Sequence, residues 1–208
     1  MLHMIHLEAK DLTRYFERRR VFKGLNFELK KGDVQVVLGK NGSGKTTLLR
    51  ILAGILPPSR GKASYSLNGD ELRGEKLQRI ISLVAPDLNL YDELTALENL
   101  EFLSKVQGLD FGERELIQTM GQVGLDERAW DQVGSFSSGM KQRLKYVNAL
   151  LKKPLVLLLD EPKANLDDQG ISFLERVVQE QKQRGILIWA TSAKEEVKYG
   201  DQILELDE

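Results

Sequence analysis

The 208-residue sequence has no cysteine, which excludes disulfides and thiolate-bound metal sites. It has only two histidines, His3 and His6, too few for a histidine-rich metal site, and we expect them to be packed or exposed in a first strand. The longest apolar run, residues 155–159, ends at Asp160 and is far shorter than the ~20 residues of a membrane span. The net charge of −1 gives no sign of a nucleic-acid or acidic membrane partner.

The first ten residues lack the basic region and following apolar core of a signal peptide. The lack of a signal peptide, together with the lack of a membrane-spanning run, predicts a cytoplasmic protein. Any membrane role would then come through a partner. The hydrophobic fraction of 41% and charged fraction of 29% are ordinary for a globular protein. The length suits one domain or two closely joined lobes.

The apolar pattern predicts an α/β protein with a helical insertion. Strands are expected at residues 5–12, 21–29, 34–38, 62–67, 80–85, 155–159 and 186–190. Helices are expected at residues 46–53 and 171–184, and helical signals dominate residues 94–151. The charged run at 17–20 is expected to be a solvated hairpin turn. Buried strands that alternate with helices favour a mainly parallel sheet, and the first strands favour an antiparallel edge.

A phosphate-binding loop is predicted at residues 39–47. The run Gly39-Lys40-Asn41-Gly42-Ser43-Gly44-Lys45-Thr46 fits the pattern G-x-x-x-x-G-K-[ST], with Thr47 next in the following helix. The glycines let backbone N–H groups face one cavity, and the helix N-terminus adds to this anion site. Lys45 is expected to reach the β- and γ-phosphates of ATP, and Thr46 to give its hydroxyl to Mg²⁺. Because a buried strand precedes the loop and a helix follows it, we favour this P-loop over a chance glycine-rich turn.

Two carboxylates, Asp160 and Glu161, follow the apolar strand at residues 155–159. The carboxyl end of a parallel strand is where ligands bind in open α/β sheets. We expect Asp160 to hold Mg²⁺ through water beside Thr46, and Glu161 to act as general base on the attacking water. Many strands end in an acidic residue, so the pair predicts a Mg²⁺ and catalytic site only in combination with the phosphate loop upstream.

Residues 136–143 complete a resemblance to the ATP-binding subunits of ABC transporters. This resemblance covers nearly the whole chain. The segment Phe136-Ser137-Ser138-Gly139-Met140-Lys141-Gln142-Arg143 is similar to the family's LSGGQ signature, which opens a helix and caps the γ-phosphate held by the opposite subunit. The resemblance implies that Ser137, Ser138 and Gly139 contact this nucleotide, whereas an ordinary serine N-cap is the alternative. Ser138 replaces the first glycine and Met140 the glutamine, a variant that points weakly to export.

The resemblance also implies two further contact residues. Residues 163–167 match the family's D-loop, in which Asp167 would bridge the two subunits near the attacking water. The adenine-stacking aromatic aligns best with Phe16 and next with Tyr15, and a flat ring there stacks on the base. Core packing is the competing explanation for either aromatic ring.

Two positions depart from the family pattern. Pro86 stands where the family has a glutamine that ligates Mg²⁺ and senses the membrane subunit, and proline has no side-chain ligand. Asp87 and Asn89 are the candidates to substitute for it. Ser192 stands where the family has a histidine on the γ-phosphate, and it donates a hydrogen bond without carrying charge. We therefore predict tight Mg-ATP binding with slowed hydrolysis.

The resemblance implies one ABC-type ATP-binding domain, with residues 1–85 and 152–208 as the P-loop core and residues 86–151 as the helical subdomain. It implies a head-to-tail dimer with a second copy or a paralogous ATPase subunit. This dimer would lie on the inner face of the cell membrane and drive a separate integral membrane permease through a groove near residues 86–97. No nucleic-acid partner is expected.

Two other functions stay open at this point. One is a soluble ABC-type ATPase that acts on nucleic acid or a protein machine, although the chain has neither the long heptads nor the cysteine-rich modules that usually accompany it. The other is a regulatory nucleotide-binding module with little catalysis, which the departures at Pro86 and Ser192 favour. The stretch 91–100 is similar to the haem-exporter subunits of cytochrome c maturation, and cargo identity lies beyond the sequence.

Overall fold

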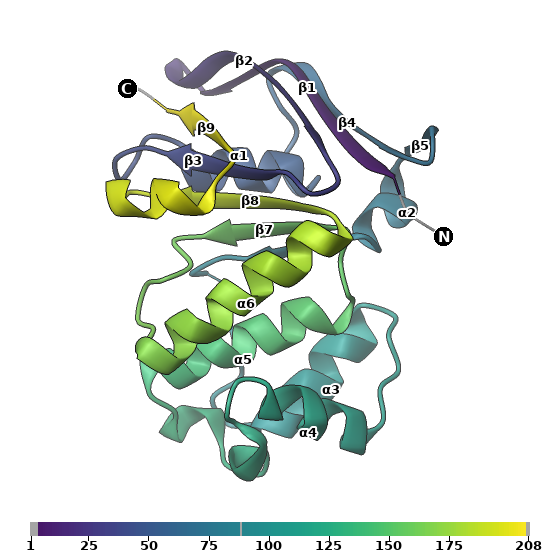
Figure 1. Cartoon of the computed structure of the whole chain (residues 1–208), viewed down its shortest axis with the longest axis vertical. Coiled ribbons are helices and arrows are strands. Elements are labelled where there is room, and N and C mark those ends of the chain that lie inside the picture. The colour runs from purple at the N-terminus through teal and green to yellow at the C-terminus, as the bar shows by residue number, and fades with distance from the viewer. Residues whose placement is uncertain (1–3, 88, 207–208) are drawn as a thin grey trace. The chain divides into compact units, whose positions relative to one another are not determined.

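The computed structural model describes residues 4–87 and 89–206, so His3 lies outside the described residues (Figure 1). The chain divides into two compact units. The core unit comprises Met1–Ala85, Pro154–Pro162 and Val178–Glu208. The helical unit comprises Pro86–Lys153 and Lys163–Val177.

The helical unit begins at Pro86, but it is larger than the range 86–151 expected from the sequence. It also takes in Lys163–Val177, which the sequence analysis placed in the core. The reason is that the first half of helix α6 (Asp168–Arg184) packs on helix α5 (Ser138–Leu151). Tyr146 of α5 meets Phe173 of α6 edge to face, with ring centroids 6.0 Å apart.

A five-stranded parallel sheet organises the core unit. Its strands, in spatial order, are β6 (Ile81–Val84), β7 (Val156–Asp160), β8 (Ile186–Thr191), β3 (Val34–Leu38) and β9 (Gln202–Glu205). Every residue of β7 and β8 is buried, which explains their unbroken apolar character. Leu38 pairs with Thr191 and Asp160 with Ala190, so the carboxyl ends of β3, β8 and β7 lie side by side. The phosphate loop and the acidic pair therefore leave the sheet at one edge.

A second, antiparallel sheet completes the core unit. Its order is β2 (Arg19–Lys30), β1 (Ile5–Phe16), β4 (Arg60–Leu67) and β5 (Asp70–Leu72), with the β1–β2 turn in the charged run as expected. One apolar cluster joins both sheets to helix α1 (Lys45–Leu52), in which Leu48, Leu49 and Leu52 are fully buried. The short helix α2 (Gly74–Gln78) precedes β6. The predicted α/β class with a parallel sheet and an antiparallel edge is confirmed.

The helical unit contains α3 (Ala96–Val106), α4 (Glu113–Gly121), α5 and two 3-10 turns, η1 (Asp126–Arg128) and η2 (Val133–Ser135). Helix α3 starts with a capping box in which Thr95 and Glu98 bond each other's backbone N–H groups. Leu100, Leu116 and Leu144, one from each helix, are fully buried where α3, α4 and α5 pack together. Within the described residues, no helix combines the length and apolar character of a membrane span.

Candidate functional site

The phosphate loop connects β3 to α1, and two of its glycines have positive φ angles. These angles are 87° at Gly42 and 100° at Gly44, a region that side chains rarely adopt. A Cβ atom on Gly44 would also lie 2.3 Å from Cγ1 of Val21, a strand β2 residue that packs against the loop. The loop can therefore follow this path only with glycine at 44, and it delivers the chain directly into the N-terminus of α1.

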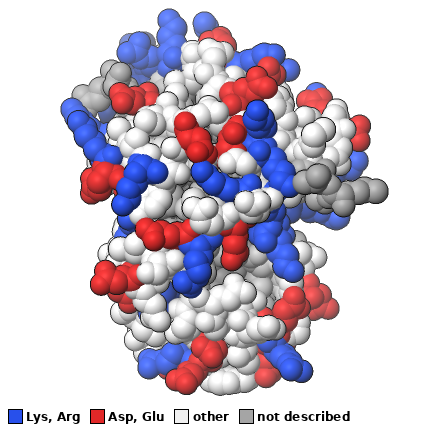
Figure 2. Space-filling view, in the orientation of Figure 1, with Lys and Arg blue, Asp and Glu red and all other residues white. Residues whose placement is uncertain are grey.

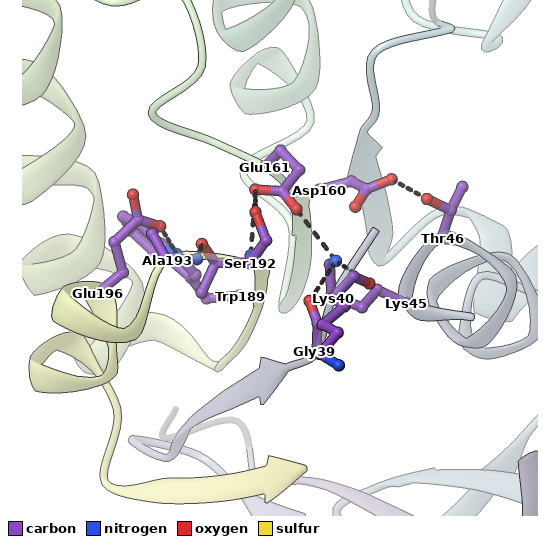
Figure 3. Close-up of polar contacts among 11 residues, drawn as sticks. Gly39, Lys40, Lys45, Thr46, Asp160, Glu161, Trp189, Ser192, Ala193 and Glu196 are labelled. Atoms are coloured by element: carbon purple, nitrogen blue, oxygen red, sulfur yellow. Dashed lines mark hydrogen bonds and ion pairs between the residues drawn. The ribbon is translucent and has the colours of Figure 1, made fainter. Parts of the chain in front are cut away.

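Lys45 is buried, with 5% of its surface exposed, and its ammonium group is held across the loop. Nζ donates to the carbonyl oxygens of Gly39 at 2.7 Å and Lys40 at 3.1 Å. It also forms an ion pair with Oε1 of Glu161 at 3.2 Å, drawn in Figure 3. Three partners match the three protons of an ammonium group, so the Lys45 side chain is held in one position across the loop.

Thr46 and Asp160 meet although they are far apart in the sequence. The Thr46 hydroxyl donates to Oδ2 of Asp160 at 2.6 Å, and Asp160 is 2% exposed. A hydroxyl and a carboxylate are the hard oxygen ligands that Mg²⁺ accepts, and proteins usually offer it one or two such groups beside substrate phosphates. The donor set therefore fits a Mg²⁺ ion shared with a nucleotide.

Glu161 has an unusual backbone and a fixed carboxylate. Its φ of 46° lies in the left-handed region, and its backbone N–H donates to the Ala190 carbonyl at 2.9 Å. Strained non-glycine residues of this kind cluster at functional sites. Oε2 accepts bonds from the backbone N–H of Ser192 at 3.3 Å and from its Oγ at 3.4 Å. Ser192, Glu161 and Lys45 thus form a continuous line of polar contacts (Figure 3).

In the helical unit, the Ser137 segment opens α5. The Ser137 Oγ accepts the backbone N–H of Met140 at 3.2 Å, so Ser137 is a true N-cap. Ser137 and Ser138 are both exposed. A Cβ on Gly139 would lie 2.7 Å from the carbonyl oxygen of Asn165, so glycine is required there for the close approach of residues 163–167. The sequence did not show this contact.

Asp167 immediately precedes α6 and is coupled to α5. Its Oδ1 accepts the Gly170 backbone N–H at 2.8 Å, while 59% of its side chain is exposed. A nitrogen of Arg143 lies 3.8 Å from Oδ2 of Asp167. Arg143 is buried and donates to the Val123 carbonyl at 2.9 Å. Arg143 therefore connects the helix that Ser137 opens to the start of α6.

The family model described as ABC transporter matches residues 22–164. The chain belongs to the ABC transporter family. The resemblance seen in the sequence is thereby confirmed, and with it the function of this family's ATP-binding subunits, which are ATPases.

Individual members support the same assignment. The chain is 32% identical to the ABC transporter ATP-binding protein YybJ of Bacillus subtilis, over 91% of this chain and 86% of that protein. It is 31% identical to the cytochrome c biogenesis ATP-binding export protein CcmA of Vibrio parahaemolyticus, over 89% of this chain and 91% of that one. A solved structure titled as the ATP-binding subunit of an ABC transporter shares 30% identity and a TM-score of 0.81, over 96% and 85% of the two chains.

At the position of the ABC adenine-stacking aromatic, Phe16 ends β1 and is 47% exposed. An exposed ring is free to stack on a base, and core packing does not account for it. The guanidinium carbon of Arg14 lies 4.4 Å from the ring centroid and covers one face. Phe16 is therefore an exposed ring with a cation on one face, and its contact with adenine stays a prediction.

At the position of the ABC glutamine, Pro86 is exposed and contributes only its backbone. Its carbonyl accepts a bond from Nζ of Lys145 in α5 at 2.8 Å. Burial lowers the pKa of Lys145 below its usual value, and the charge of nearby Asp87 partly opposes this. Asn89 is exposed. Sequence reasoning missed Lys145, whose hydrogen bond joins the Pro86 backbone to helix α5.

Proposed function

We propose that this chain hydrolyses Mg-ATP at an interface with a second copy of itself or a paralogous ATPase subunit. In this proposal hydrolysis drives a separate integral membrane permease from the cytoplasmic face of the cell membrane. The observation that carries the catalytic part is the convergence of Lys45, Thr46, Asp160 and Glu161 at one sheet edge of the core unit.

Each of these side chains has a distinct task in the proposed reaction. The loop N–H groups and Lys45 bind the β- and γ-phosphates, while Thr46 and Asp160 hold Mg²⁺, which neutralises phosphate charge when bound. Glu161 takes a proton from the attacking water. Ser192 orients the Glu161 carboxylate through its two hydrogen bonds. Gly39, Lys40, Asn41, Gly42, Ser43, Gly44 and Thr47 complete the cradle.

The second half of the site is proposed to come from a partner chain. Ser137, Ser138 and Gly139 lie at a helix N-terminus, whose N–H groups favour an anion. Facing the nucleotide of an opposite subunit, they would cap its γ-phosphate, with Asp167 beside the attacking water. Because each chain carries both surfaces, a symmetric dimer completes two sites at once.

A cluster of exposed aromatic side chains on the helical unit supports docking to a permease. Tyr91 is 46% exposed and Phe102 is 44% exposed, and their rings meet edge to face with centroids 5.2 Å apart. Buried Asn99 bonds the backbone N–H and carbonyl of Tyr91, which fixes this residue beside α3. Exposed aromatic pairs are typical of interaction sites. We propose that the permease binds this face, which includes Tyr91 from the expected contact region at residues 86–97.

The double variant Tyr91→Ser, Phe102→Ser is expected to lose stable binding to the proposed permease. The reason is the loss of two apolar anchors, which commonly weakens an interface at least about tenfold. The measurement is co-purification from membranes, together with ATP turnover of the isolated chain, which should be unchanged. The control is Ile203→Ser, an equally exposed apolar residue on β9 of the core unit. Undiminished co-purification of the double variant would refute this docking face, and absence of any permease complex would refute the transport role.

We further propose that transport is outward, because the similar protein CcmA is described as an export protein and Met140 gives the exporter-like signature variant. A haem-exporter-like role is the specific form of this proposal.

We propose that hydrolysis is slow, because Pro86 and Ser192 lack the charged or liganding groups of their family counterparts. Ser192→His is expected to raise ATP turnover about tenfold or more, since one preorganised donor is commonly worth 10²–10³-fold in rate. The measurement is phosphate release at saturating Mg-ATP, with Ser192→Ala as the control that changes the hydroxyl without adding an imidazole. Unchanged turnover in Ser192→His would show that the missing histidine does not limit the reaction.

A regulatory module with little catalysis is the second candidate, favoured by the same two residues. It predicts nucleotide-dependent dimerisation with no turnover in any variant.

An ATPase acting on nucleic acid has less support. In Figure 2, the visible face has acidic and basic side chains interspersed and shows no broad basic tract among the described residues.

A further inference from the structure

A cavity of about 300 Å³ lies beside the phosphate loop in the core unit. Its lining consists of Leu38, Gly39, Lys40, Ser43, Ser192, Lys194, Glu205 and Leu206. The hydroxyl of Ser43 is buried within this lining, with 5% of the residue exposed, and has no hydrogen-bond partner in the part of the chain that the structure describes. Buried hydroxyls are normally bonded, so this one calls for a polar ligand. A Cβ on Gly39 would lie 2.3 Å from the same hydroxyl, so only glycine leaves it uncovered.

Lys194 brings a positive charge to this cavity. Among residues 4–87 and 89–206, no ion pair or hydrogen bond of its ammonium group is found, although Glu205 shares the lining. Lys45, by contrast, is fully engaged by two carbonyls and Glu161. A solvent-exposed ammonium group without an ion pair, on the same cavity as an unbonded hydroxyl, is a suitable environment for an anionic oxygen.

The segment that carries Lys194 is firmly anchored. Lys194 begins the 3-10 helix η3 (Lys194–Tyr199), which follows β8. Glu196 accepts the indole N–H of buried Trp189 at 2.8 Å, as Figure 3 shows, and Tyr199 stacks on the Trp189 ring with centroids 4.7 Å apart. These two contacts anchor the helix at Glu196, two residues after Lys194, and at its C-terminal residue Tyr199.

The cavity also adjoins the reacting end of the site. Ser192 lines it and contacts the carboxylate of Glu161, which in turn contacts the ammonium of Lys45. Lys45 is the group proposed to reach the β- and γ-phosphates. The terminal phosphate of a nucleotide held by the phosphate loop, or a phosphate ion in its place, is therefore the candidate anion for this cavity.

We propose that Lys194 binds the terminal phosphate of ATP, with the Ser43 hydroxyl as a second donor. This inference rests on the proposed placement of ATP in the phosphate loop and deepens it. Lys194 distinguishes ATP from ADP because ADP has no γ-phosphate to contact.

Lys194→Gln is expected to weaken Mg-ATP binding about tenfold or more, the usual weight of a hydrogen bond to a charged group, while Mg-ADP binding changes less than about twofold. The measurement is titration of the full chain with each nucleotide by calorimetry. Lys194→Arg keeps the charge and should retain most of the ATP preference. The control is Lys198→Gln in the same helix, whose ammonium lies 5.2 Å from the Tyr199 ring centroid and outside the cavity lining.

Three outcomes separate the claims. Equal weakening of ATP and ADP in Lys194→Gln, or no change in either, would overturn the role of Lys194 while leaving the nucleotide site intact. Loss of selectivity in Lys198→Gln as well would also overturn it, because a general charge effect would then suffice. Failure of the unaltered chain to bind Mg-ATP would overturn the proposed function itself and this inference with it.

Discussion

Glu161→Gln is expected to lower ATP turnover about 10²–10⁴-fold while Mg-ATP still binds. The substitution keeps the size of the side chain and removes the carboxylate that would accept a proton from water. Its left-handed backbone, the two bonds from Ser192 and the ion pair with Lys45 all hold that carboxylate in one place. Because binding depends on the loop and Lys45, the variant should accumulate in its ATP-bound state.

The measurement is steady-state phosphate release beside a nucleotide-binding titration. Glu195→Gln is the matched control, because Glu195 is an exposed carboxylate on η3 and should behave as the unaltered chain does. Turnover in Glu161→Gln close to that of the control would remove Glu161 from the reaction and would require another general base.

Gly44→Ala is expected to weaken nucleotide binding at least about 10²-fold. The added Cβ would lie 2.3 Å from Cγ1 of Val21, and φ at this position is 100°. Overpacking and backbone strain of this kind each cost about 1–3 kcal/mol. The loop must then move, and its N–H groups no longer converge on the phosphates.

Two variants separate the clash from the strain. Gly42→Ala has a φ of 87° but nothing within 4 Å of its Cβ, so it should show the strain alone and a smaller loss of binding. Val21→Ala should restore part of the affinity in the Gly44→Ala background, because it removes Cγ1, the atom with which the added Cβ would clash. Binding by Gly44→Ala as tight as that of the unaltered chain would contradict the loop geometry. The measurement is the dissociation constant for Mg-ATP.

The sequence predicted the elements that have strong local signals. Strand β3 lies where expected at Val34–Leu38, and β7 and β8 agree within one residue, because unbroken apolar runs of this length form buried strands. The phosphate loop was found from glycine spacing. Strand β1 extends to Phe16, beyond the expected end at residue 12, through register shifts that apolar alternation does not show.

Other elements arise from contacts that are distant in sequence. Strands β5 (Asp70–Leu72) and β9 (Gln202–Glu205) are short and largely exposed, and they form by pairing with β4 and β3. Helix α6 was predicted, but its division between the two units depends on the packing of Phe173 against Tyr146. Local periodicity predicts neither these short strands nor the division of α6 between the two units.

The candidate site was predictable in its residue types and less so in its surroundings. The meeting of Thr46 with Asp160 follows from a parallel sheet whose strand ends share one edge. The need for glycine at 139 depends on the carbonyl of Asn165, and the position of Lys194 depends on the Trp189 anchor. Such steric and cavity features appear only once the chain is folded.

The central claim is that ATP completes its site by joining two copies of this chain. Sedimentation of Glu161→Gln with and without Mg-ATP tests it most directly, because slow turnover preserves the ATP-bound state. We expect a monomer without nucleotide or with Mg-ADP, and a dimer with Mg-ATP. A chain that binds Mg-ATP and remains monomeric at every concentration of protein would contradict the shared site in a homodimer.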